Sequence, residues 1–243
     1  MLELTVKDQR ELVSEDVLRQ AMQCNAEILR RAQAGEAKYS DSQGWLDVNE
    51  WASDAILTHI EQIAADVRAH CDAFVIIGVG GSNNAARSVI EALAQQSGDT
   101  EIIYAGNTLN PNALNRMLKS LEGKDYTIDC IAKNFETLEP GSSFRILRKA
   151  MTAKYGPEEA ARRTICTGTY GSSLEELCKA EGYTFVPFPT NVGGRYTAMT
   201  YVGLLPMAVA GIDIRTLVQG AADMQKQLHE GAPEDNLALR YAC

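Results

Sequence analysis

The chain has 243 residues, of which 45% are hydrophobic, and this is enough for one large or two small domains with a real core. The formal net charge of -9 at pH 7 argues against general binding to nucleic acid or to an anionic membrane surface. A small anion can still be held by helix dipoles and a few basic side chains.

The cysteines are scattered, with no C-x-x-C pair and no spacing typical of a metal site. No segment has the pattern of a signal peptide, and no apolar run approaches the length of a membrane span. These features predict a cytoplasmic protein with reduced thiols. The cysteines are Cys24, Cys71, Cys130, Cys166, Cys178 and Cys243.

Two helices are expected before the first strand. Ser14 is a suitable N-cap, and the apolar spacing after it predicts a helix up to about Ala32. A polar stretch over 35–44 is expected to be a loop. The stretch Trp45–Asp47 is expected to lead into a second helix, because apolar residues recur at helical intervals from Trp51 to Val67.

A strand, a glycine turn and a helix follow. Phe74–Gly78 is short and apolar, which predicts a strand buried on both faces of a parallel sheet. Gly80, Gly81 and Ser82 then lead into a helix expected over Ala85–Gln95. The N–H groups and helix dipole at such a turn favour an anion, although glycine turns are also made for packing alone.

Strands and helices then alternate, which predicts an α/β fold: a three-layer, doubly wound, five-stranded parallel sheet with flanking helical segments. Ligands of such sheets bind at the carboxyl ends of the strands. From Thr197 onward the chain is expected to be helical. The remaining expected strands are 101–105, 126–132, 163–167 and 183–187, and the remaining helices are 111–121, 139–155 and 172–181.

Two further segments are expected at the carboxyl edge of the sheet. Ala132–Thr137 follows a buried strand and opens a helix, so its amides, Lys133 and Thr137 are candidates for binding the same anion. An ordinary capped helix start is the alternative. In Asn191–Thr197 two glycines allow close backbone approach and place Arg195 at the rim of the site; the alternative is a surface turn.

The motifs together resemble the phosphoglucose isomerase family, in its shorter bacterial form. The similar stretches include Gly44–Asp47, Gly78–Ser82, Glu139–Ile146, Val192–Thr197 and Val202–Asp213. The resemblance implies two sugar-isomerase (SIS-type) α/β domains and a homodimer. It implies interconversion of glucose 6-phosphate and fructose 6-phosphate, a step of glycolysis and gluconeogenesis, through an enediol and without metal or organic cofactor.

The resemblance also implies roles for individual residues. Arg195 corresponds to the arginine that stabilises the enediolate, and Gly194 adjoins it in the substrate site. The positions implied to bind the substrate phosphate are Gly81, Ser82, Lys133, Asn134 and Thr137.

The phosphate loop departs from the family pattern at three positions. Ala132 and Asn134 stand where the family has hydroxyl residues, and Glu136 replaces one of two paired threonines. If Glu136 faced the pocket, its charge would oppose a phosphate. If it points to solvent, the amide of Asn134 can still donate to the anion.

The family's general-base Glu, ring-opening His and late Lys match no motif in the chain. The three histidines, His59, His70 and His229, are interpreted as structural or solvated. We therefore expect an N-terminal portion of the enzyme that is inactive alone, divided into a helical segment (1–45), an SIS-type domain (46–196) and a second helical segment (197–243). The alternatives are a stand-alone SIS-type sugar-phosphate-binding or regulatory module, and a self-associating interaction surface.

Overall fold

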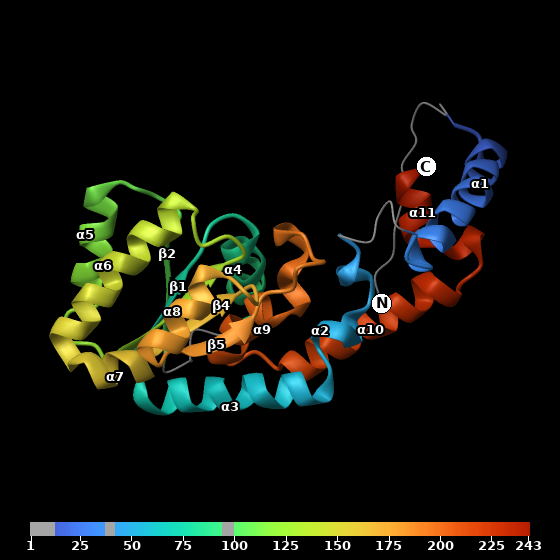
Figure 1. The fold of residues 1–243 in the computed structure, drawn as a ribbon. Coiled ribbons are helices and arrows are strands. Elements are labelled where there is room, and N and C mark those ends of the chain that lie inside the picture. Colours follow the sequence, from blue (N-terminus) through green and yellow to red (C-terminus); the bar gives the residue numbers. More distant parts are fainter. Residues whose placement is uncertain (1–12, 37–41, 94–99) are drawn as a thin grey trace.

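The computed structural model of the protein describes residues 13–36, 42–93 and 100–243. In these residues a sheet and the helices on its two faces form one body (Figure 1). A long helix, α10 (Ile214–Glu230), leads from this body to a smaller group of helices. That group contains α1 (Glu15–Gln33) and α11 (Leu237–Ala242), so segments from both ends of the sequence lie together.

The sheet has five strands in the order β2-β1-β3-β4-β5, and every neighbouring pair is parallel. This confirms the predicted α/β fold. Every residue of β1 and β3 is buried, as expected for central strands that are covered on both faces. The strands are β1 (Ala73–Ile77), β2 (Glu101–Ala105), β3 (Tyr126–Ala132), β4 (Thr164–Gly168) and β5 (Thr184–Pro187).

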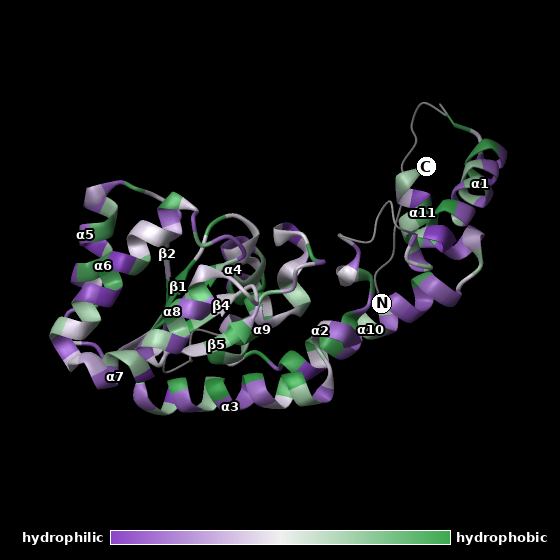
Figure 2. Ribbon diagram, in the orientation of Figure 1, coloured by the Kyte–Doolittle hydropathy of each residue, from purple (hydrophilic) through white to green (hydrophobic). Residues whose placement is uncertain are grey.

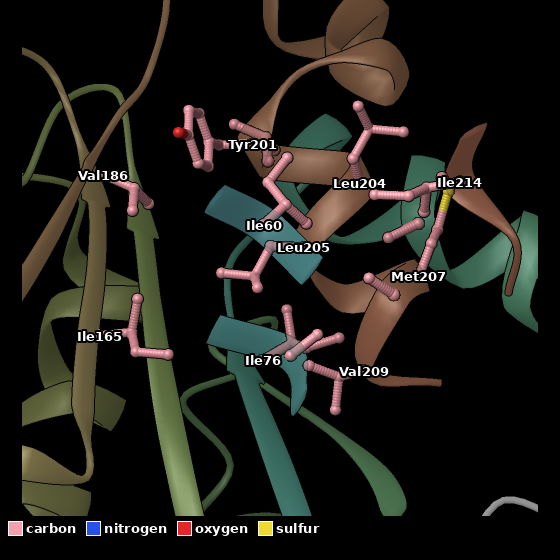
Figure 3. Packing of buried hydrophobic residues seen from close by; sticks show 14 of the residues in the cluster. Ile60, Ile76, Ile165, Val186, Tyr201, Leu204, Leu205, Met207, Val209 and Ile214 are labelled. Atoms are coloured by element: carbon pink, nitrogen blue, oxygen red, sulfur yellow. The ribbon is translucent and has the colours of Figure 1, made fainter. Parts of the chain in front are cut away.

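Helices cover both faces of the sheet, and β1 contributes alternate side chains to each face. On one face, Phe74 and Ile76 pack with apolar residues of α3 (Asp54–His70), α4 (Gly81–Leu93) and α9 (Tyr201–Val209). Figure 3 shows how side chains of α3 and α9 meet those of the strands. On the other face, Val75 and Ile77 pack with α5 (Pro111–Ser120), α6 (Leu138–Tyr155), α7 (Pro157–Arg162) and α8 (Ser173–Glu181).

The smaller group of helices buries Met22 of α1 and Leu239 of α11, and polar contacts also join its segments. The Gln23 side chain donates to Glu234 of η3 (Pro233–Asp235) at 3.1 Å, and Arg240 donates to Glu15 at 3.0 Å. Hydrophobic residues gather in the strands, whereas α1 and α10 carry many hydrophilic ones (Figure 2). At the start of α1 the predicted cap is confirmed, because the hydroxyl of Ser14 accepts from the N–H of Val17.

The second expected helix is divided, and in this respect the prediction was wrong. A 3-10 turn, η1 (Gly44–Leu46), is followed by α2 (Val48–Trp51), which ends before α3 begins at Asp54. Asp47 caps α2 by accepting from the N–H of Asn49 at 3.0 Å, and Ser53 has an extended backbone. Apolar periodicity indicates which residues face the core but not whether the helix is continuous. Both α2 and α3 bury apolar residues, although the helix is broken between them.

The glycine turn is shorter than expected. Helix α4 begins at Gly81 rather than Ala85, so Gly81 and Ser82 lie in its first turn. The expected end of this helix at Gln95 lies outside the described residues. The division of the chain at 45/46 and 196/197 stays a prediction. Within the described ranges, no helix has both the length and the apolar composition needed to cross a membrane.

Candidate functional site

The order of the strands creates a topological switch point between β1 and β3. From β1 the chain goes to β2 on one side and later returns to place β3 on the other side. Ligands of such sheets bind where the loops after the two strands diverge. These loops begin at Gly78 and Lys133, so the two predicted phosphate-binding segments flank the switch point.

The turn after β1 exposes helix amides at this edge. Gly80 has a φ of 59°, a conformation that glycine adopts without strain. Its carbonyl accepts from the N–H groups of Asn83 at 3.1 Å and Asn84 at 2.8 Å. The N–H groups of Gly81 and Ser82 belong to the first turn of α4 and have no intrahelical acceptor, so they are suited to an anion.

Gly106, directly after β2, brings the start of α6 close to the end of β1. Its φ is 81°, and a Cβ there would lie 2.9 Å from the nitrogen of Gly78 and 3.2 Å from the Cα of Pro140. Sequence reasoning missed this residue. The available signal was a single glycine directly after an expected strand, where backbone segments approach closely.

The start of α6 forms a compact hydrogen-bonded turn. The hydroxyl of Thr137 donates to the carbonyl of Asn134 at 3.0 Å, and the side-chain oxygen of Asn134 accepts from the N–H of Glu136 at 2.9 Å. Glu136 is exposed to solvent. Thr137 occupies the N-cap position of α6 without making a side-chain capping bond, so the first amides of this helix have no cap.

Lys133 connects this turn to the loop after β5. Its Nζ donates to the carbonyl of Thr190 at 2.8 Å and to that of Val192 at 3.0 Å. Sequence reasoning placed Lys133 on the phosphate and did not foresee these two bonds. The loop continues into η2 (Gly194–Met199), which carries Arg195.

A direct backbone contact joins the glycine turn to the arginine segment. A Cβ on Gly81 would lie 1.9 Å from the carbonyl oxygen of Gly194 and 2.6 Å from the nitrogen of Arg195. The same carbonyl accepts from the hydroxyl of Thr197 at 2.8 Å. Gly81, Ser82, Gly194 and Arg195 are therefore brought together, although more than a hundred residues separate the two pairs in the sequence.

Arg195 is exposed beside two aromatic rings. Its guanidinium carbon lies 5.2 Å from the ring centre of Tyr196, which stacks on Trp45 at a centroid distance of 5.0 Å. Sequence reasoning assigned Tyr196 to packing and gave Trp45 no role in the site. Next to this stack is a cavity of about 390 Å³, bordered by Trp51, Met224 and other largely apolar side chains.

The histidines lie in different places. His59 shares a hydrogen bond of 2.8 Å with the hydroxyl of Tyr201, and Nδ1 of His70 lies 2.9 Å from a backbone oxygen of its own helix. His229 borders the cavity beside Arg195. Within the part of the chain that the structure describes, no three His, Cys, Asp or Glu side chains gather as a possible metal site.

The family model and the curated relatives that match this chain agree with one another. Residues 27–243 match the model of the family described as phosphoglucose isomerase. A glucose-6-phosphate isomerase from Staphylococcus saprophyticus is 35% identical over 237 residues, which are 96% of this chain and 54% of the relative. One from Symbiobacterium thermophilum is 38% identical over 210 residues, 82% of this chain and 47% of the relative. The chain thus spans about half the length of these curated relatives.

Solved structures show the same fold. A hypothetical protein from Thermus thermophilus superposes with a TM-score of 0.81 at 24% identity, over 94% of this chain and 54% of that one. A glucose-6-phosphate isomerase from Chlamydia trachomatis superposes with a TM-score of 0.75 at 19% identity, over 93% of this chain and 49% of that one.

Proposed function

Since this chain belongs to the phosphoglucose isomerase family, we propose that it supplies the sugar-phosphate-binding half of a glucose-6-phosphate isomerase active site. The observation that supports the proposal is the close approach of Gly81 to the carbonyl of Gly194, which brings the glycine turn after β1 next to Arg195. A sugar phosphate has an anionic end and a reacting end, and these two segments offer one partner for each.

The phosphate is proposed to lie at the switch point between β1 and β3. There it would accept from the amides of Gly81 and Ser82, from the Ser82 hydroxyl and from the side-chain amide of Asn134. The Thr137 hydroxyl would donate to it after turning away from the carbonyl of Asn134. Two helix N-termini then act on one anion, which offsets the acidic net charge of the chain. The exposed position of Glu136 supports a phosphate loop that still binds its ligand.

Arg195 is proposed to act at the reacting end. Isomerisation moves a proton between C1 and C2 through a cis-enediol, so negative charge develops on the two sugar oxygens. A fixed guanidinium stabilises this charge more than it stabilises the neutral sugar, and such differential binding accelerates the reaction. The ring of Tyr196, which stacks on Trp45, lies beside the guanidinium.

A second candidate function is a sugar-phosphate-binding or regulatory module without chemistry. The altered loop favours it, because Ala132 and Asn134 replace two hydroxyl donors and Glu136 adds a carboxylate. The two functions share the phosphate site. They differ in whether the reacting end is recognised through Arg195.

Calorimetric titration with glucose 6-phosphate, fructose 6-phosphate and inorganic phosphate tests the proposed site. We expect saturable binding of both sugar phosphates, weakened about tenfold by Ser82→Ala and by Thr137→Val, because each variant removes a hydroxyl near a charged ligand. Ser88→Ala is the matched control, since its hydroxyl lies on the same helix but donates to the carbonyl of Ala85 at 2.9 Å. Absence of binding at millimolar ligand would overturn the proposed function.

The purified 243-residue chain is expected to form no fructose 6-phosphate from glucose 6-phosphate. The physical reason is that no residue in this chain matches the family's general base, so nothing in the proposed site removes the C2 proton. A coupled assay for fructose 6-phosphate checks this. Turnover above the uncatalysed rate would contradict the expectation and would require a general base within this chain.

A further inference from the structure

Lys133 is the first residue after β3, and its ammonium group is already engaged. An ammonium has three N–H groups, and two of them donate to the carbonyls of Thr190 at 2.8 Å and Val192 at 3.0 Å. The Nζ also lies 6.0 Å from the ring centre of Phe188, which is buried at the start of the same loop. All these partners belong to the loop that leads to Arg195.

The loop is held from both sides at this point. The carbonyls of Thr190 and Val192 accept from Lys133, whereas that of Asn191, between them, accepts from the N–H of Gly44 at 2.8 Å. Val192 also forms an antiparallel bridge with Gln43. The side chain of Asn191 also donates to Glu50 at 3.1 Å, so Lys133 is one of several groups that hold segment 190–192.

The backbone of Lys133 is itself well fixed. It continues a fully buried strand, and its carbonyl accepts from the hydroxyl of Thr169 at 3.1 Å. The side chain thus ties a rigid sheet edge to a loop that would otherwise lack that support. Only two residues separate Val192 from Arg195, so a bond that fixes the backbone of Val192 also restricts the backbone of Gly194 and Arg195.

The charge of Lys133 has a second consequence. Unpaired carbonyl oxygens near the carboxyl edge would repel an anion bound there. The carbonyl oxygens of Thr190 and Val192 accept from the ammonium of Lys133, and its positive charge offsets their partial negative charge. Their repulsion of an anion bound at this edge is therefore smaller. Hydrogen bonds to a charged donor are also stronger than those between neutral groups.

We propose that Lys133 is a positioning residue that holds segment 190–192 in place, so that Gly194 and Arg195 keep their contact with Gly81. The inference rests on the proposed function, because it assigns Lys133 to the alignment of the reacting end rather than to the phosphate. A direct phosphate ligand and a positioning residue predict different losses when the ammonium is removed. If Lys133 binds the phosphate directly, its removal lowers the affinity for every phosphate compound equally. If it positions segment 190–192, its removal lowers the affinity only for compounds that reach Arg195.

The test compares Lys133→Met and Lys133→Arg with the control Lys149→Met, whose lysine lies on the exposed side of α6. The probes are inorganic phosphate and 6-phosphogluconate, a sugar phosphate with a carboxylate at its far end. For Lys133→Met we expect phosphate affinity within about twofold of the parent protein and 6-phosphogluconate affinity about tenfold lower. The guanidinium of Lys133→Arg can donate to both carbonyls and should restore part of the loss.

A readout without ligand accompanies the titrations. Trypsin cleaves after arginine, and cleavage at Arg195 requires local opening of η2. We expect Lys133→Met to be cut there about tenfold faster, with the control unchanged and thermal unfolding showing that all variants are folded. Equal losses for both probes with an unchanged cleavage rate would show that Lys133 binds phosphate, and would overturn the proposal. If the parent protein binds neither probe, the proposed function fails, while the cleavage rates still decide the role of Lys133.

Discussion

Gly81→Ala is expected to abolish sugar-phosphate binding and to lower the free energy of unfolding by about 3 kcal/mol. The new Cβ would lie 1.9 Å from the oxygen and 2.2 Å from the carbon of the Gly194 carbonyl. Both atoms are backbone, so no side chain can rotate away to relieve the overlap. Either α4 or η2 must shift, and each carries a part of the proposed site.

Gly194→Ala is the matched control for this prediction. The two glycines face each other, but a Cβ on Gly194 meets no atom within 4 Å. We expect its free energy of unfolding to stay within about 0.5 kcal/mol of the parent protein, and its loss of sugar-phosphate binding to be smaller than that of Gly81→Ala, because no backbone segment has to move. Urea unfolding and calorimetric titration measure both quantities. Equal behaviour of the two variants would show that the close approach of α4 and η2 does not hold the site together.

The second prediction concerns the carboxyl of Asp129 in the middle of β3. Burial raises its pKa from 3.8 to about 7, and the hydroxyl of Thr167, which donates at 3.0 Å, only partly offsets this effect. The native state therefore holds a proton on Asp129 more tightly than the unfolded chain does. Asp129 thus contributes stability that is complete below pH 3.8 and is lost as the pH rises through about 7.

Asp129→Asn removes this dependence, because an amide does not titrate. We expect the stability of the parent protein relative to Asp129→Asn to fall between pH 4 and pH 8 by up to roughly 4 kcal/mol. Taking the difference between the two proteins cancels the titration of all other groups. Denaturant unfolding at a series of pH values provides the measurement, and a difference that does not change with pH would contradict the prediction.

Asp235→Asn serves as the control for this series. Asp235 is an exposed carboxylate of η3, far along the chain from the sheet. Its substitution should leave a stability profile parallel to that of the parent protein. If the control variant also departed from the parent between pH 4 and pH 8, the effect at Asp129 could not be assigned to burial.

The sequence by itself determined the order of the elements and the class of fold. The short apolar run of β1, followed by glycines, and the alternation of such runs with helical patterns along the chain indicate buried strands of a parallel sheet. It also indicated the family, because the motifs around Gly81 and Arg195 are local and can be recognised without knowing where they lie. Capping at Ser14 was predictable for the same reason, since the partner is three residues away.

Tertiary structure alone decided how these motifs meet. Residues from different loops meet at three places: where Gly81 approaches Gly194, where Lys133 donates to Thr190, and where Gly106 approaches Gly78 and Pro140. The division of the expected helix near Ala52 and the raised pKa of Asp129 likewise depend on what surrounds a residue in space. Periodicity and local capping describe interactions within a few residues. Folding brings distant segments together, and only this determines where two backbones approach closely, which carboxyl group is buried and which carbonyls accept from a lysine.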